Sequence, residues 1–211
     1  HHGAALNNLA ILLQEGGQST EALGCYEKAI ALAPDDVLPR INLGNLYLAG
    51  KDLASAEAAY RAALSIRPEL PEAWRSLAEL YVARGERPAA RECLQKALEF
   101  RPAYFEASMR LGDLWREDNN LKEAEACFKW VVDQRPDDVV ALNRLGESIQ
   151  TQGRRQQAEI LYRHALQRAP DNADILNNLG ILLHERKAYA ESEACYRRAL
   201  VAAPEFTEVW N

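Results

Sequence analysis

Apolar and small side chains return along this chain at a fixed interval of 34 residues. We number the positions of the interval from 1, starting at residues 3, 37, 71, 105, 139 and 173. Position 7 is always leucine, and position 8 is alanine or glycine. Positions 20 and 27 hold small or β-branched residues, and position 24 holds a tyrosine, phenylalanine or leucine. Such exact recurrence indicates tandem repeats.

Each interval predicts two helices. The apolar positions 4, 7, 8 and 11, followed by 20, 24, 27 and 28, have the three-and-four spacing of one helical face. A breaker such as Gly16-Gly17 separates the two sets, and a proline at position 32, such as Pro68, ends the second helix. The acid or Asn after this proline, for example Asp35, Asp137 or Asp171, is expected to cap the next helix or to interact with its positive end.

Six repeats follow one another without an insertion. They cover residues 3–36, 37–70, 71–104, 105–138, 139–172 and 173–206. We interpret His1 and His2 as a tag remnant and residues 207–211 as the start of a truncated seventh repeat. One helix pair cannot bury its own apolar face, so the pairs are expected to stack into an all-α, right-handed superhelical solenoid of antiparallel helix pairs.

The third repeat carries a recognisable motif. It reads Trp74-x-x-Leu77-Ala78-x-x-Tyr81, followed by Ala90, Leu94, Ala97 and Pro102. This motif resembles the tetratricopeptide repeat, and the other five repeats match it with small departures. The resemblance implies a scaffold that binds other proteins rather than an enzyme. In such a solenoid the first helices line the concave wall.

The predicted binding wall consists of positions 2, 5, 6, 9, 12 and 13 of the first helices. It holds nine acids against four arginines, a net charge of −5 within a chain whose net charge is −6. This balance favours a basic or polar peptide as partner. The candidate amides are Asn8, Asn42, Asn45, Asn143, Asn177 and Asn178. The candidate charged residues are Arg75, Arg110 and Arg144 for acids and Glu79, Asp113 and Glu147 for bases.

Asparagine occupies position 6 in repeats 1, 2 and 6. An amide both donates and accepts hydrogen bonds, so a row of amides could pair with a peptide backbone of any sequence. The row is similar to the asparagine ladder in the repeat arms of O-linked N-acetylglucosamine transferases. Ser76, Arg110 and Arg144 interrupt it, and the two arginines suggest a local contact with an anionic group. Equally, these amides could form an ordinary solvated helix face.

Three functions remain open. The first is a peptide-binding scaffold, the second is the substrate-recognition arm of a larger glycosyltransferase, and the third is a structural scaffold that assembles end to end. The sequence contains no recognisable catalytic or cofactor motif, so neither an enzyme activity nor a cofactor is predicted within it.

Composition and charge exclude several classes of protein. Apolar residues make up 48% of the chain, which is enough to fold. The negative charge argues against nucleic-acid binding, and no apolar stretch is long enough for a membrane span, so a soluble protein is expected. The four cysteines all fall at position 23, on separate repeats, which predicts packing residues rather than a disulfide or metal site. Free thiols fit a reducing compartment, so the cytoplasm is the expected location.

Overall fold

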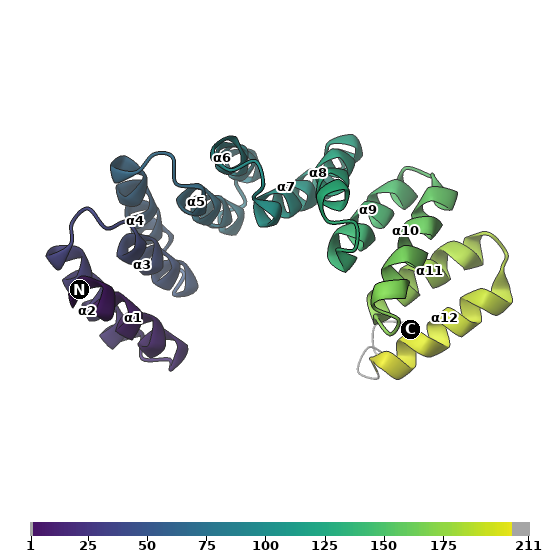
Figure 1. The fold of residues 1–211 in the computed structure, drawn as a ribbon, viewed down its shortest axis with the longest axis horizontal. Coiled ribbons are helices and arrows are strands. Elements are labelled where there is room, and N and C mark those ends of the chain that lie inside the picture. Colours follow the sequence, from purple (N-terminus) through teal and green to yellow (C-terminus); the bar gives the residue numbers. More distant parts are fainter. Residues whose placement is uncertain (1, 204–211) are drawn as a thin grey trace. The chain divides into compact units, whose positions relative to one another are not determined.

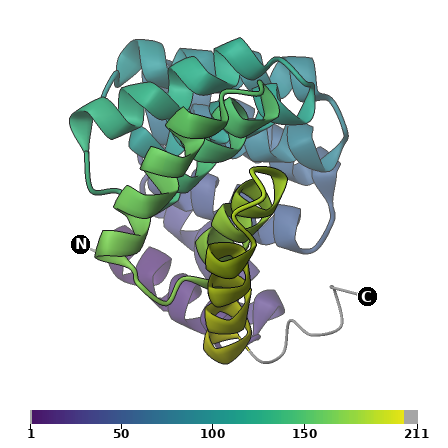
Figure 2. The same cartoon turned by 90° about the vertical axis from the view of Figure 1, so that its right-hand side faces the viewer.

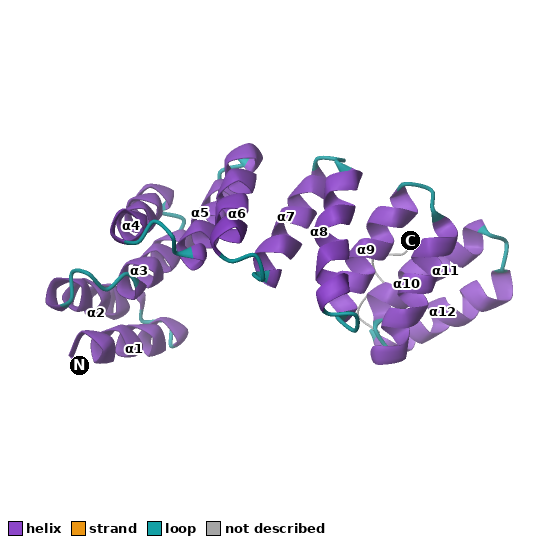
Figure 3. Ribbon diagram, turned by 45° about the horizontal axis from the view of Figure 1, so that its top comes forward, coloured by secondary structure: helices purple, strands orange, loops and turns teal. Residues whose placement is uncertain are grey.

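A computed structural model gives the fold, and residues 2–203 are described. They form twelve α-helices and no strand, which confirms the predicted all-α class (Figures 1 and 3). The helices are α1 (His2–Glu15), α2 (Ser19–Leu32), α3 (Leu38–Ala49), α4 (Leu53–Ile66), α5 (Pro71–Ala83), α6 (Arg87–Phe100), α7 (Phe105–Glu117), α8 (Leu121–Gln134), α9 (Val139–Thr151), α10 (Arg155–Arg168), α11 (Ala173–Glu185) and α12 (Tyr189–Ala202). The predicted start of a seventh repeat, with Trp210, lies outside the described residues.

The chain divides into two compact units, and the division falls between Ala107 and Ser108, inside α7. In the first unit each first helix packs on its own second helix, as α1 does on α2, and each second helix packs on the next first helix, as α2 does on α3. The second unit repeats this order from α8 to α12, the helix that faces the viewer in Figure 2. First helices also contact one another, as α3 does α1 and α11 does α9.

In the turn inside every helix pair, the residue at position 15 adopts the left-handed backbone conformation. These residues are Gly17, Lys51, Gly85, Asn119, Gly153 and Lys187, with φ between 59° and 79°. In the first turn the amide of Gly17 donates to the carbonyl of Gln14 at 3.0 Å, and that of Gln18 donates to the carbonyl of Leu13 at 2.8 Å. This pair of bonds is the Schellman motif, which satisfies the last carbonyls of a helix. The second helix therefore starts at the same point in each repeat.

Aromatic rings at position 24 fill the space between the paired helices. Tyr60, Phe128 and Tyr162 are fully buried, and the small residues at positions 20 and 27 beside them are buried too. In the fifth repeat the ring lies directly on the backbone of the first helix, because a Cβ built on Gly146 would lie 2.5 Å from Cε1 of Tyr162. Glycine at position 8 thus permits this close approach.

From the second repeat on, positions 3 and 10 are also buried, although the sequence pattern did not assign them to the core. Leu46, Leu80, Leu114 and Leu182 at position 10 are all buried. Leu46 packs with Ala22 and Tyr26, which belong to the preceding repeat. In the first repeat Leu12 at the same position is 65% exposed. These positions therefore bury surface between repeats rather than within a pair.

The helix caps lie one residue later than predicted. Asp138 accepts the amide hydrogen of Ala141 at 3.0 Å, and Asn172 accepts that of Ile175 at 3.1 Å. Asp137 instead pairs with Arg168, so of the two roles predicted for it the capping role is wrong. The reason is geometric: α9 begins at Val139, and a cap must directly precede the first helical residue.

Candidate functional site

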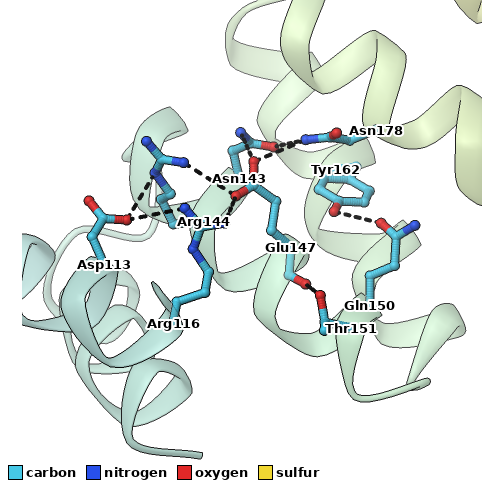
Figure 4. A network of polar contacts seen from close by, with 9 residues as sticks. All are labelled: Asp113, Arg116, Asn143, Arg144, Glu147, Gln150, Thr151, Tyr162 and Asn178. Atoms are coloured by element: carbon cyan, nitrogen blue, oxygen red, sulfur yellow. Dashed lines mark hydrogen bonds and ion pairs between the residues drawn. The ribbon is translucent and has the colours of Figure 1, made fainter. Parts of the chain in front are cut away.

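A polar network lies on the first helices of the second unit (Figure 4). It joins three successive repeats. Asp113 and Arg116 come from α7, Asn143, Arg144 and Glu147 from α9, and Asn178 from α11. All six residues occupy positions that the sequence analysis assigned to the binding wall, and five of them are among the candidate residues.

Arg144 lies between two carboxylates of its own chain. Its Nε is 3.4 Å from Oδ1 of Asp113, and its Nη1 is 3.3 Å from Oε2 of Glu147. Arg116 approaches the same two acids, with Nη1 3.2 Å from Glu147 and Nη2 3.6 Å from Asp113. The two arginines therefore balance two acids, and the charge of Arg144 is matched before any partner arrives.

Asp113 is a half-buried acid of this network. Burial raises the pKa of its carboxyl, and the nearby Arg144 and Arg116 only partly oppose that effect. A carboxylate that is kept from water in this way interacts strongly with the guanidinium groups beside it. We therefore interpret Asp113 as an anchor for the arginines rather than as a contact for a partner.

Two of the three asparagines at position 6, Asn42 and Asn178, bond to the preceding repeat. Nδ2 of Asn178 donates to Oδ1 of Asn143 and to Oε1 of Glu147, both at 3.1 Å. Asn143 also donates to Oε1 of Glu147 at 3.0 Å. In the first unit Asn42 likewise donates to Oδ1 of Asn7 at 2.9 Å. These amides link neighbouring repeats, a use that the sequence analysis missed.

A signal for this link exists in the sequence. Asn7 and Asn42 are separated by 35 residues, as are Asn143 and Asn178, one more than the repeat length. The offset places position 5 of one repeat opposite position 6 of the next. Asparagines in that relation would therefore have indicated a bond between repeats.

A pocket of about 380 Å³ opens between α9 and α11. Its lining consists of Val139, Val140, Asn143, Arg144, Glu147, Asn172, Asp174, Ile175, Asn177 and Asn178. Five of the twelve candidate residues are thus brought together around one cavity: Asn143, Arg144, Glu147, Asn177 and Asn178. Asp113 does not line the pocket, but it forms an ion pair with Arg144, which does.

The other candidates are dispersed. Asn8 is exposed, Nε of Arg75 donates to Oη of Tyr104 at 2.7 Å, and Asn45 accepts from Oη of Tyr60 at 2.7 Å. Glu79 is half-buried on α5. Arg110 on α7 is 4.0 Å from Glu117. The first unit has two further pockets, of about 530 and 510 Å³, and none of the candidates lines either one.

The cysteines are packing residues, as their position in the repeat predicted. Cys93 and Cys195 are buried, Cys25 and Cys127 are half-buried, and all four are free thiols. Burial raises the pKa of Cys93 and of Cys127 to about 11, so neither is a thiolate at neutral pH.

Between residues 2 and 203 no three His, Cys, Asp or Glu side chains come together as metal ligands could. In the same stretch no helix has both the length and the apolar character required to cross a bilayer.

Comparison with known proteins identifies the repeat. Three family models described as tetratricopeptide repeat match residues 7–71, 47–103 and 137–205. All three describe the repeat and none describes an enzyme. A comparison with curated proteins finds no significant match.

Solved structures share the fold. YrrB, described as a TPR protein with an unusual peptide-binding site, is 22% identical over 85% of this chain and 93% of its own, with a TM-score of 0.70. The type IV pilus biogenesis factor PilW is 21% identical over 98% and 95%, with a TM-score of 0.78. PilF of Pseudomonas aeruginosa is 15% identical over 97% and 93%, with a TM-score of 0.80.

These identities are low, so the likenesses concern the fold alone. None of the three proteins is described as a glycosyltransferase, and the similarity to the arm of those enzymes stays a prediction, as do end-to-end self-association and the cellular compartment. The repeat itself is recognised over residues 7–103 and 137–205, and its helix pairs are present throughout the described structure. The chain belongs to the tetratricopeptide repeat family.

Proposed function

We propose that the chain is a non-catalytic interaction module that binds a segment of a partner protein on the wall of its first helices. In this proposal the pocket between α9 and α11 is the main site of contact with the partner. The observation that carries the proposal is the composition of that pocket: seven of its ten lining residues occupy predicted wall positions. Its volume of about 380 Å³ lies within the range of known ligand sites.

The lining suits a peptide. Val139, Val140 and Ile175 supply apolar surface, and the amides beside them can pair with backbone groups. The bonds among Asn143, Glu147 and Asn178 fix the polar side chains before binding, which reduces the entropy lost on association. The peptide-binding site named for YrrB supports the same class of function.

The test uses random dodecapeptides displayed on phage. Peptides that the protein retains are synthesised with a fluorophore, and their affinity is measured by fluorescence anisotropy. Val140→Ser changes an exposed pocket residue that makes no polar contact. Ile160→Ser is the matched control, because Ile160 is an equally exposed aliphatic residue on α10, a second helix.

We expect Val140→Ser to weaken binding about fivefold, as the loss of roughly 1 kcal/mol of apolar contact implies. Ile160→Ser should change the affinity less than about twofold, the size of a typical surface substitution. If both variants lose the same affinity, or if the protein retains no peptide, the proposal fails.

A further inference from the structure

The pocket between α9 and α11 has unused hydrogen-bond acceptors. Both amide hydrogens of Asn178 are engaged, by Asn143 and Glu147, so its Oδ1 is the group left for a ligand. Oδ1 of Asn177 is buried and has no hydrogen-bond partner. The carboxylate of Asp174 has neither an ionic nor a hydrogen-bonding partner among residues 2–203.

The positive charge of the pocket is already matched. Arg144 is the one basic residue of the lining, and it lies between Asp113 and Glu147. Glu147 is matched in turn by Arg144 and Arg116. Asp174 is therefore the uncompensated charge of this pocket, and it is negative.

Helix termini do not reverse this preference. Both α9 and α11 begin beside the pocket, and free amide groups at helix N-termini attract anions. Here the side chains of Asp138 and Asn172 each occupy one of those amides, by accepting from Ala141 and Ile175. Asp174, in the first turn of α11, adds negative charge at the same place.

Comparison between repeats shows what position 5 receives. Asn7 and Asn143 hold this position in repeats 1 and 5, and the Oδ1 of each accepts a side-chain N–H from the following repeat. Asn177 holds it in repeat 6, and its Oδ1 has no hydrogen-bond partner among residues 2–203. An asparagine at this position is thus placed to accept an N–H group.

We propose that this pocket receives a lysine or arginine side chain of the partner segment. The charged head donates to the carboxylate of Asp174 and to Oδ1 of Asn177 and Asn178. Its methylene stem packs against Val139, Val140 and Ile175, as long basic side chains do on apolar surface. The inference rests on the proposed function and specifies which residue of the partner the pocket selects.

The first test compares peptide selection by three proteins. The dodecapeptide library is selected on the wild type, on Asp174→Asn and on Asp133→Asn. Asp133 is an exposed acid on α8, so the control makes the same change of charge away from the pocket. We expect a lysine or arginine to be enriched at one place in the peptides that the wild type and the control select. Asp174→Asn should abolish this enrichment.

The second test is a double-mutant cycle on one selected peptide. Its enriched lysine is replaced by norleucine, or its arginine by citrulline, which removes the charge and retains the length. On wild-type protein the uncharged peptide should bind about tenfold more weakly, as for a lost charge-assisted hydrogen bond. On Asp174→Asn the difference between the two peptides should fall well below tenfold, because the carboxylate that pairs with the charge is gone and only the amide oxygens of Asn177 and Asn178 remain.

The outcomes separate the two proposals. Enrichment of an acidic or neutral residue, or equal discrimination by Asp174→Asn and wild type, overturns the choice of a basic side chain. If Val140→Ser still weakens binding and Ile160→Ser does not, the wall as a peptide-binding surface stands. If no peptide is retained, or Val140→Ser has no effect, the proposed function fails and this inference fails with it.

Discussion

At the scale of single residues, the six left-handed turn positions are not equivalent. Three are glycine, which has no side chain to strain. Asn119 is of a type that tolerates this region, whereas Lys51 and Lys187 have φ of 62° and 63° with an ordinary side chain. For such residues the conformation costs about 1 kcal/mol. The backbone at the two lysines is therefore strained, and a glycine at the same positions would not be.

Replacing these lysines should stabilise the protein. We expect Lys51→Gly and Lys187→Gly each to raise the free energy of unfolding by about 0.5 to 1 kcal/mol, measured by urea denaturation. The control is Lys28→Gly, an exposed position inside α2, where glycine should lower stability by about 1 kcal/mol. A loss of stability in all three variants would show that the turns are not strained.

At the scale of elements, the contact between an aromatic ring and a glycine sets the distance between paired helices. The ring of Tyr162 lies where a Cβ on Gly146 would be, and Tyr60 lies against Gly44 in the same way. In the first repeat Ala10 occupies position 8 and is fully buried. The spacing of each pair therefore depends on the combination of residues at positions 8 and 24.

Adding one carbon at this contact should separate the helices. Gly146→Ala should lower the free energy of unfolding by about 1 to 3 kcal/mol, the usual effect of overpacking a core. Gly24→Ala is the control, because a Cβ there meets nothing within 4 Å and alanine favours a helix. Thermal unfolding followed by circular dichroism should show a lower midpoint for the first variant and an equal or higher one for the second. Equal midpoints would contradict the packing account.

The sequence predicted the elements better than their contacts. Alanines at positions 20 and 27, such as Ala158 and Ala165, are buried as the helical spacing indicated. The burial of position 10 was missed because periodicity within one helix reveals one apolar face but not a second face turned toward the preceding repeat. Ser148 at that position even weakens the apolar pattern, although it is fully buried.

The candidate site was only partly predicted, because contacts between repeats are not visible in the pattern of one helix. The wall positions do surround the pocket between α9 and α11. The bond from Asn178 to Asn143 joins different repeats, however, and follows from how they are offset in space. The internal pairing of Arg144 likewise depends on Asp113 of the preceding repeat. Such partners are not visible in the composition of a single helix.

At the scale of the whole molecule, contacts are local in sequence. The contacts described within each unit join the two helices of one repeat or helices of adjacent repeats. Stability in such an array is close to a sum of repeat and interface contributions. Disturbance in one repeat should therefore remain near it.

Hydrogen exchange measured by mass spectrometry can test this locality. Gly146→Ala should speed exchange in α9 and α10 and, to a lesser degree, in α11. Amides of α1 to α4 should exchange as in the wild type, and they serve as the internal control. Faster exchange by the same factor in every helix would indicate a single cooperative transition and contradict the prediction.

The asparagine link between repeats has a consequence for how such a chain can be rearranged. All six hairpins share one turn geometry, so each 34-residue segment could be moved as a cassette without redesigning its hairpin. The amide bond, however, joins two different cassettes. Placing the sixth cassette behind the fourth would set Asn178 opposite Met109 instead of Asn143. Shuffled versions of this protein should therefore retain their hairpins but lose polar bonds at the new junctions. The bonds between repeats thus depend on the order of the cassettes as well as on their individual sequences.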